Sequence, residues 1–510
     1  MANYIMMMGT SSHVGKSILA TAMCRILYRK GRKVVPFKAQ NMALNSYVTR
    51  DGDEMGRAQV AQAEAAGMEP MVDMNPVLLK PTGNAASQVI IMGKPVGNMS
   101  AREYHRGYSL KAFDAVKEAL GRLDKEYDTI VIEGAGSPAE INLKANDIVN
   151  MRVAKYLQAP VLLIADIDRG GALASLVGTL ELLDEEERAL VKGLVINKFR
   201  GDVTLLTPAI DFLEKKTGKP VLGVVPHIDQ MGIDDEDSVS LEEKQAAPTE
   251  GDIRIAVIQT PKISNFTDFD ALAHEKDVAL YYVKSVEDLG EPDVIMLPGS
   301  KNTTEDMLYL RKSGLGEKIL AHAKAGKAVI GICGGYQMLG EVIRDPQHTE
   351  SQNDEVAGLG LLGMETVFAS EKLTSQVVAQ CQDLHFMGQS ISADNLQGYE
   401  IHMGHTAFTR EADKHPFTVC QRRGKACASQ EGTANTAGNV FGTYIHGVFD
   451  NDVFRRSVLN ALRHSKGLEA LANTRNVMAE KQKAYEHLAD VVENALDMEK
   501  LYQIMGEKTC

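Results

Sequence analysis

A cysteine and a distant histidine are the residues whose types and settings could carry covalent chemistry. Cys333 follows the apolar run 329–332 and lies among glycines in the segment Gly-Ile-Cys-Gly-Gly-Tyr-Gln. This pattern predicts a strand, a sharp turn and the start of a helix, with the thiol at the turn. His446 ends a second apolar segment, Phe-Gly-Thr-Tyr-Ile-His. A lone cysteine after a strand is more often a core residue, but a thiol with an imidazole base is a nucleophilic pair, so we predict that Cys333 and His446 are catalytic.

A second kind of chemistry is indicated near the start of the chain. The segment Gly-Thr-Ser-Ser-His-Val-Gly-Lys-Ser ends in Gly15, Lys16 and Ser17, after a short apolar strand and before a helix-forming run. Backbone N–H groups of such a loop face phosphates, the lysine adds a charge and the serine hydroxyl can reach magnesium. The strict phosphate-loop spacing has a glycine where Thr10 stands, so this is a variant loop. We expect these residues to bind ATP.

Two further polar residues stand at the ends of predicted strands. Lys38 follows the run Val-Val-Pro-Phe, and Glu133 follows Thr-Ile-Val-Ile. Ligands gather at the carboxyl ends of strands in an open parallel sheet. A carboxylate buried beside a sheet is costly unless it binds something, so Glu133 is predicted to be a magnesium ligand. Between these strands, a stretch carrying Lys80, Lys94, Arg102 and Arg106 is a candidate clamp for a substrate with several carboxylates.

The elements that must position these residues form two alternations of strand and helix. We predict an α/β protein with two doubly wound parallel-sheet domains and a helical tail. The first domain spans 1–233, an acidic stretch at 234–250 links it to the second at 251–455, and 456–510 forms the helical extension. Leucines at helical spacing after Asp452 predict helices that pack on the second domain.

Composition excludes several classes of protein. The chain has 510 residues, a net charge of −13 and a pI near 5.6, which argues against a general nucleic-acid binder. No apolar run is long enough to cross a bilayer and the start lacks a secretory signal, so we expect a cytoplasmic protein with no membrane partner. Six scattered cysteines without a Cys-x-x-Cys pair predict neither disulfides nor zinc. No tightly bound prosthetic group is expected, and the sequence leaves the oligomeric state open.

These motifs resemble known families. The cysteine segment is similar to the nucleophile elbow of class I glutamine amidotransferases, and Pro298-Gly299-Ser300 to their oxyanion loop. The variant phosphate loop resembles that of dethiobiotin synthetase and its relatives, and Ser11 replaces the second lysine of partition ATPases. With the patterns Asn-Met-x-x-Asn-Ser-Tyr at 41–47 and Gly-Tyr-Glu-Ile-His at 398–402, the chain resembles the cobyric acid synthase family over nearly its full length.

The resemblance implies roles for further residues. Gly299, Gly334 and Gln337 would form the oxyanion and glutamine site. In the first domain, Lys38 would lie over the transferred phosphate, Asn197 would meet the adenine edge, and Glu54 would join Ser17 and Glu133 at the magnesium site. The residues implied at the substrate are Asn41, Tyr47, Glu400 and His402.

One departure from the amidotransferase pattern concerns the third member of the catalytic site. Class I domains place a glutamate two residues after the histidine, where this chain has Val448. Asp450 is near in sequence, but the sequence alone names no acid to orient His446.

The function implied by the resemblance joins both chemistries. Glutamine would be the ammonia donor, and ATP with Mg²⁺ would activate a carboxylate. The substrate would be the corrinoid adenosylcobyrinic a,c-diamide, amidated at its b, d, e and g side chains to give adenosylcobyric acid. Two alternatives stay open, namely a cobyrinic acid a,c-diamide synthase and a non-catalytic P-loop nucleotide switch in which the cysteine domain is structural.

Overall fold

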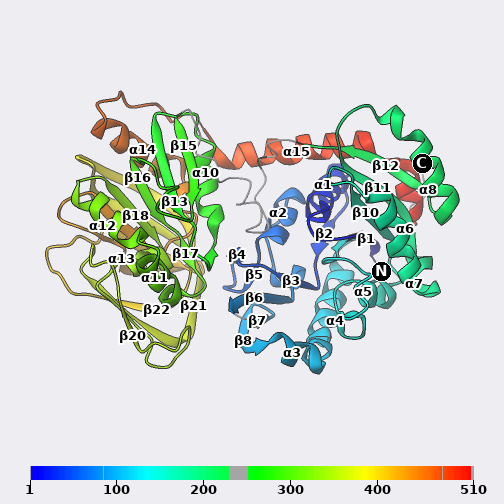
Figure 1. Ribbon diagram of the computed structural model, residues 1–510, viewed down its shortest axis with the longest axis horizontal. Coiled ribbons are helices and arrows are strands. Elements are labelled where there is room, and N and C mark those ends of the chain that lie inside the picture. The colour runs from blue at the N-terminus through cyan, green and yellow to red at the C-terminus, as the bar shows by residue number, and fades with distance from the viewer. Residues whose placement is uncertain (1, 84, 229–231, 233–250, 474, 507–510) are drawn as a thin grey trace.

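The computed structural model describes residues 2–83, 85–228, 232, 251–473 and 475–506 and contains two α/β domains (Figure 1). The predicted linker at 234–250 lies outside the described residues. Each domain has a mostly parallel sheet covered by helices, which confirms the predicted fold class. No helix in the described part of the chain is long and apolar enough to span a membrane.

The central sheet of the first domain has six strands, all paired in parallel. Its middle strands are almost wholly buried because helices cover both faces, which explains their continuous apolar runs. In sheet order the strands are β12 (Val221–Pro226), β11 (Val191–Phe199), β10 (Val161–Asp166), β1 (Asn3–Gly9), β9 (Thr129–Glu133) and β2 (Val34–Phe37). The helices are α1 (Lys16–Arg29), α2 (Arg57–Ala65), α4 (Ser109–Glu126), α5 (Met151–Leu157), α6 (Ala172–Leu182), α7 (Glu185–Leu190) and α8 (Thr207–Thr217).

A small second sheet and a strand pair lie on the side of this domain that faces its neighbour (Figure 1). The stretch that we expected to be a substrate clamp forms most of this sheet, because its glycines and prolines punctuate short strands. The sheet contains β3 (Gln40–Met42), β6 (Val77–Gly83), β7 (Ala86–Ile91) and β8 (Lys94–Ser100), and the pair is β4 (Ser46–Val48) with β5 (Glu54–Gly56).

The second domain is built on another six-stranded sheet, in which only the edge strand β25 is antiparallel. In order its strands are β15 (Val278–Val283), β13 (Ile253–Ile258), β16 (Val294–Leu297), β18 (Ala328–Ile332), β26 (Val440–Thr443) and β25 (Thr433–Ala434). Its helices include α11 (Thr303–Lys312), α12 (Leu315–Lys324), α13 (Gly334–Leu339) and α14 (Asp452–Ser465).

A largely antiparallel sheet that the sequence did not predict joins this domain. Its two longest strands, β21 (Met364–Phe386) and β22 (Gln389–Phe408), form a hairpin that reaches the first domain. The remaining strands are β19 (Val342–Arg344), β20 (Glu355–Ala357), β23 (Phe417–Arg422) and β24 (Lys425–Glu431).

The C-terminal helices correct one prediction. Helix α14 packs on the second domain as expected, through residues such as Leu459 and Leu462. Helix α15 (Val477–Ala495) and α16 (Met498–Ile504) instead return to the first domain, as Figure 1 shows. Leu488 and Val492 of α15 pack in the same cluster as the first strand and α1. Helical spacing revealed the apolar face of α15, but it carried no information on which domain that face covers.

Candidate functional site

Cys333 lies at a strained turn between β18 and α13. Its φ of 50° and ψ of −108° are unusual for a residue with a side chain, and such strain is typical of functional turns. Two glycines allow the turn: a Cβ at Gly331 would lie 2.7 Å from the carbonyl carbon of Gly335, and a Cβ at Gly335 would collide with the Leu297 carbonyl. The glycines on either side of Cys333 therefore allow this turn to pack closely against its own sheet.

His446 is held beside the thiol by an acid that the sequence did not reveal. Its Nδ1 lies 2.7 Å from Oδ2 of Asp268, whose other oxygen accepts a hydrogen bond from Gly447 N at 2.8 Å. Burial lowers the pKa of His446, but its interactions with Asp268 and Cys333 outweigh burial and raise the pKa to about 10. The structure thus brings together a nucleophile, a base and an orienting acid, and all three are buried.

Asp268 is the acid that orients His446, which the sequence alone could not name. It belongs to a short 3-10 helix, Phe266–Phe269, and stands 178 residues before His446. No motif surrounds it, and Asp450, the acid near His446 in sequence, is not the one bonded to the imidazole Nδ1.

The two glycines expected at the oxyanion site lie beside the catalytic pair. A Cβ on Gly299 would lie 3.3 Å from Cε1 of His446, and one on Gly334 would lie 2.7 Å from Ser300 N. Both positions therefore need glycine for close approach. Gln337 lines the same cavity, where its amide accepts from Thr303 Oγ1 at 3.0 Å and donates to Tyr444 Oη at 3.1 Å.

The cavity around Cys333 is small, about 40 Å³. His402 lines it, stacked on Tyr444, with Nδ1 2.8 Å from the Gly404 carbonyl. Burial lowers the pKa of His402 to about 4, so its ring is neutral at pH 7. Its Nε2 has no hydrogen-bond partner among the residues that the structure describes. His402 is therefore placed to meet a ligand at the thiol site, away from the first domain's phosphate loop.

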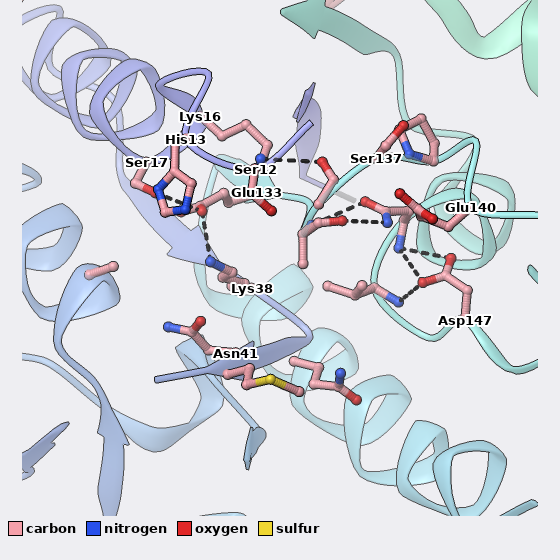
Figure 2. A pocket seen from close by; sticks show the side chains of 18 of the residues that line it. Ser12, His13, Lys16, Ser17, Lys38, Asn41, Glu133, Ser137, Glu140 and Asp147 are labelled. Carbon is pink, nitrogen blue, oxygen red and sulfur yellow. Dashed lines mark hydrogen bonds and ion pairs between the residues drawn. The ribbon is translucent and has the colours of Figure 1, made fainter. Parts of the chain in front are cut away.

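A second, much larger cavity of about 1390 Å³ lies over the first domain's sheet. Lys16, Ser17, Lys38 and Glu133 line it together, and Figure 2 shows them converging. Glu133 Oε1 accepts from Ser17 Oγ at 2.9 Å and from Lys38 Nζ at 2.8 Å. Its other oxygen accepts from Gln62 Nε2 at 2.6 Å. The structure thus gathers four of the residues that the sequence predicted for phosphate and metal, namely Lys16, Ser17, Lys38 and Glu133.

The phosphate loop is braced from behind by Asn197. The Asn197 amide donates to the Val14 carbonyl at 2.8 Å and packs so closely on Gly15 that a Cβ there would collide with it. Gly15 has a φ of 98°, which favours glycine. Lys16 reaches across the loop to the carbonyls of Ser11 and Gly136, at 3.0 and 3.3 Å. In this structure Asn197 supports the loop that would hold the nucleotide.

The donor set fits a magnesium ion bound with a nucleotide. Ser17 and Glu133 present two oxygens side by side, and Mg²⁺ is usually held by one or two protein oxygens together with phosphates and water. Within the described ranges, no three His, Cys, Asp or Glu side chains cluster so as to hold a metal by themselves.

Glu54 lies elsewhere, and the structure does not support its predicted place at the magnesium site. Its carboxylate is fully buried and accepts from Lys80 Nζ at 2.8 Å and from Lys372 Nζ at 2.5 Å. Burial alone would raise the pKa of Glu54, but the two ammonium groups hold it well below its usual range. Lys372 comes from the second domain, so this cluster is an interdomain contact. Lys80 belongs to the same contact through its bond to Glu54.

The four residues expected at the substrate are divided between locations. Asn41 lines the large cavity and His402 the small one. Tyr47 accepts from Gln376 Nε2 at 2.9 Å across the domain interface, and Glu400 pairs with Arg422 at 2.8 Å. Neither Tyr47 nor Glu400 lines either of these cavities.

Comparison with known proteins agrees with the two domains. Residues 5–239 match the CobQ/CobB/MinD/ParA nucleotide binding domain, and residues 254–454 match the CobB/CobQ-like glutamine amidotransferase domain. The cobyric acid synthase of Moorella thermoacetica is 54% identical over 508 residues, which cover 99% of this chain and 98% of that one. The cobyric acid synthase of Pelotomaculum thermopropionicum is 53% identical over 516 residues, covering 99% and 97%. The chain therefore belongs to the cobyric acid synthase family of glutamine amidotransferase-type ligases, as its motifs predicted.

Proposed function

We propose that the protein amidates peripheral carboxylates of a corrinoid in cobalamin biosynthesis, with glutamine as nitrogen donor and ATP with Mg²⁺ as the activating pair. The observation that carries this proposal is the buried Cys333–His446–Asp268 arrangement in the same chain as the Lys16–Ser17–Glu133 cavity. Full-length similarity to cobyric acid synthases supports the substrate class. The substrate we expect is adenosylcobyrinic a,c-diamide, amidated at b, d, e and g.

The glutaminase half-reaction follows from the geometry around the thiol. Cys333 attacks the side-chain carbonyl of glutamine, and backbone N–H groups at Gly299 and Gly334 stabilise the oxyanion. The raised pKa of His446 keeps its imidazolium charged beside the thiolate, so it can give its proton to the departing ammonia. Water then hydrolyses the thioester with His446 as base, which releases glutamate and restores the thiol. The unpartnered Nε2 of His402 is our candidate for a direct contact with glutamine.

The synthetase half-reaction needs positioning and charge neutralisation. A free carboxylate is a poor acyl donor, so the γ-phosphoryl group of ATP is transferred to it and ADP leaves. Lys16 and Lys38 would neutralise the transferred group, while Ser17 and Glu133 would hold a magnesium ion that would supply further charge neutralisation. Ammonia then attacks the acyl phosphate carbon and inorganic phosphate departs, leaving the amide.

Mass spectrometry of a corrin a,c-diamide incubated with the protein, ATP, Mg²⁺ and glutamine tests the proposal. Each carboxylate converted to a carboxamide lowers the mass by about 1 Da, because NH₂ replaces OH at the activated acyl centre. The stepwise loss of four such units is the expected result. ATP hydrolysis without any mass change would contradict the corrinoid assignment. Amidation of cobyrinic acid, with no amidation of its a,c-diamide, would favour the a,c-diamide synthase.

A further inference from the structure

One segment of the first domain contacts both active sites. Residues 40–44 line the large cavity. Two residues after this segment, the fully buried Ser46 contacts the second domain. The chain therefore passes from the large cavity to the second domain within a few residues.

The Ser46 carbonyl is bound by two side chains of the second domain. Asn265 Nδ2 donates to it at 3.0 Å and Tyr399 Oη donates at 3.1 Å. Asn265 also donates to Tyr399 Oη at 2.9 Å, so the three groups form a closed buried triangle. Lys80, which lines the Cys333 cavity, donates to the Ser46 hydroxyl at 2.9 Å.

Both partners of the Ser46 carbonyl hold the catalytic pair. The Tyr399 ring stacks on His446 with centroids 5.1 Å apart, and the two residues exchange backbone hydrogen bonds at 2.9 and 3.1 Å. Asn265 precedes the 3-10 helix of Asp268, and its carbonyl accepts from Asp268 N at 3.1 Å. The Ser46 carbonyl of the first domain therefore binds both Tyr399, which packs on His446, and Asn265, which bonds to Asp268.

We propose that the segment 40–46 couples the two sites, with Tyr399 and Asn265 as positioning residues for the His446–Asp268 pair. Ligands that bind in the large cavity shift the position of this segment. The hydrogen bonds of the Ser46 carbonyl transmit that shift to the His446 imidazole. Glutamine is then hydrolysed fastest when a nucleotide and an acid acceptor are ready to use the ammonia. This inference rests on the proposed function for the identity of the ligands that fill the large cavity.

The test compares glutamate formation with and without ATP, Mg²⁺ and a corrin a,c-diamide. In the unaltered protein, kcat for glutamate formation rises when these ligands are added. Tyr399→Phe keeps the ring on His446 but removes the hydroxyl that bonds to the Ser46 carbonyl and to Asn265, and it lowers this stimulation about three- to tenfold, the scale of a lost buried hydrogen-bonding group. Asn265→Gly is a second variant, because Asn265 has a φ of 52° that glycine tolerates.

Thr374→Val is the matched control. It removes another buried hydroxyl-to-carbonyl bond between the same domains, from Thr374 to Gly52 at 2.7 Å, without touching His446 or Asp268. The proposal predicts that this variant keeps the stimulation, and that Tyr399→Phe keeps amidation driven by ammonium salts.

Three results would overturn the coupling: equal glutamate rates with and without the ligands in the unaltered protein, full stimulation in Tyr399→Phe, or an equal loss in Thr374→Val. Failure of the proposed function is a separate result, since it would show as no amide from either nitrogen source while glutamate formation stays measurable.

Discussion

The two cavities differ in how much of their chemistry the protein itself completes. Around Cys333 the cavity is about 40 Å³, and the base and acid are already bonded to each other. Over the first domain the cavity is about 1390 Å³, and Ser17 and Lys38 are both bonded to Glu133. The thiol site thus already holds its base and acid in contact, whereas Ser17 and Lys38 at the other site are paired with the carboxylate that we propose as a magnesium ligand. We therefore expect ligand binding to rearrange the side chains of the second site more than those of the first.

Replacing the nucleophile should separate the reactions of the two cavities most completely. Cys333→Ala is expected to lower glutamine-dependent amidation by about 10⁵- to 10⁶-fold, because no other group can form the thioester. Ammonium-driven amidation should persist, and product formation with each nitrogen source measures both. Cys381→Ala, at a buried cysteine in β21 that lines neither cavity, is the matched control and should keep both activities. Glutamine hydrolysis by Cys333→Ala would contradict the assignment.

Removing the orienting acid tests how complete the thiol site is. Asp268→Asn should lower kcat for glutamate formation by about 10³- to 10⁴-fold, since it removes the charge that orients and stabilises the imidazolium. The raised pKa of His446 keeps the ring protonated up to about pH 10. Without the carboxylate that pKa falls, so the alkaline limb of the pH profile should move to lower pH. The same shift in Asp450→Asn, with none in Asp268→Asn, would show that the wrong acid has been chosen.

The large cavity should respond differently to loss of its loop lysine. Lys16→Met is expected to lower amidation by about 10²- to 10³-fold with glutamine and with ammonium alike, because the charge on the transferred phosphoryl group is no longer neutralised. Steady-state rates with both nitrogen sources provide the measurement. A loss of amidation with glutamine but not with ammonium would mean that Lys16 acts in the glutaminase reaction and not in phosphoryl transfer.

The interdomain carboxylate should affect stability more than chemistry. Glu54→Gln leaves Lys80 and Lys372 buried without a counter-charge and should lower the free energy of unfolding by about 3–5 kcal/mol. Because the pKa of Glu54 is held well below its usual 4.5, its contribution is present above that pH and is lost as the pH falls further. Denaturant unfolding at neutral and acid pH measures both effects.

Asp53→Asn is the matched control for Glu54→Gln. Asp53 pairs with Lys94, whose side chain is 58% exposed, so the variant should cost no more than about 1 kcal/mol. A Glu54→Gln protein as stable as this control would show that the cluster contributes little to docking of the domains.

The sequence predicted what is local and missed what depends on distant partners. The glycines around Cys333 and the strands ending in Lys38 and Glu133 lie within short segments, so their pattern was readable. Asp268 was missed because it orients a histidine 178 residues away and no motif marks it. Glu54 was misplaced for a related reason, since its partner Lys372 is 318 residues away.

The same limit applies to the fold. Parallel strands were predicted from continuous apolar runs that alternate with helix-forming segments, and both central sheets contain them. The hairpin of β21 and β22 was not, because its strands alternate buried and exposed residues irregularly along an interface. The apolar face of α15 was visible, but the apolar partners that it covers lie in β1 and α1, and the Arg25–Glu486 pair across the same contact joins residues 461 apart.

The central claim is that the thiol cavity supplies the nitrogen that the large cavity incorporates. Glutamine carrying an isotopic label in its amide nitrogen tests this directly, with ATP, Mg²⁺ and a corrin a,c-diamide as the other substrates. Mass spectrometry of the product should show one labelled nitrogen for each carboxylate amidated, with the label absent when Cys333→Ala is supplied with unlabelled ammonium. An amidated corrinoid without label from the unaltered protein would contradict the account.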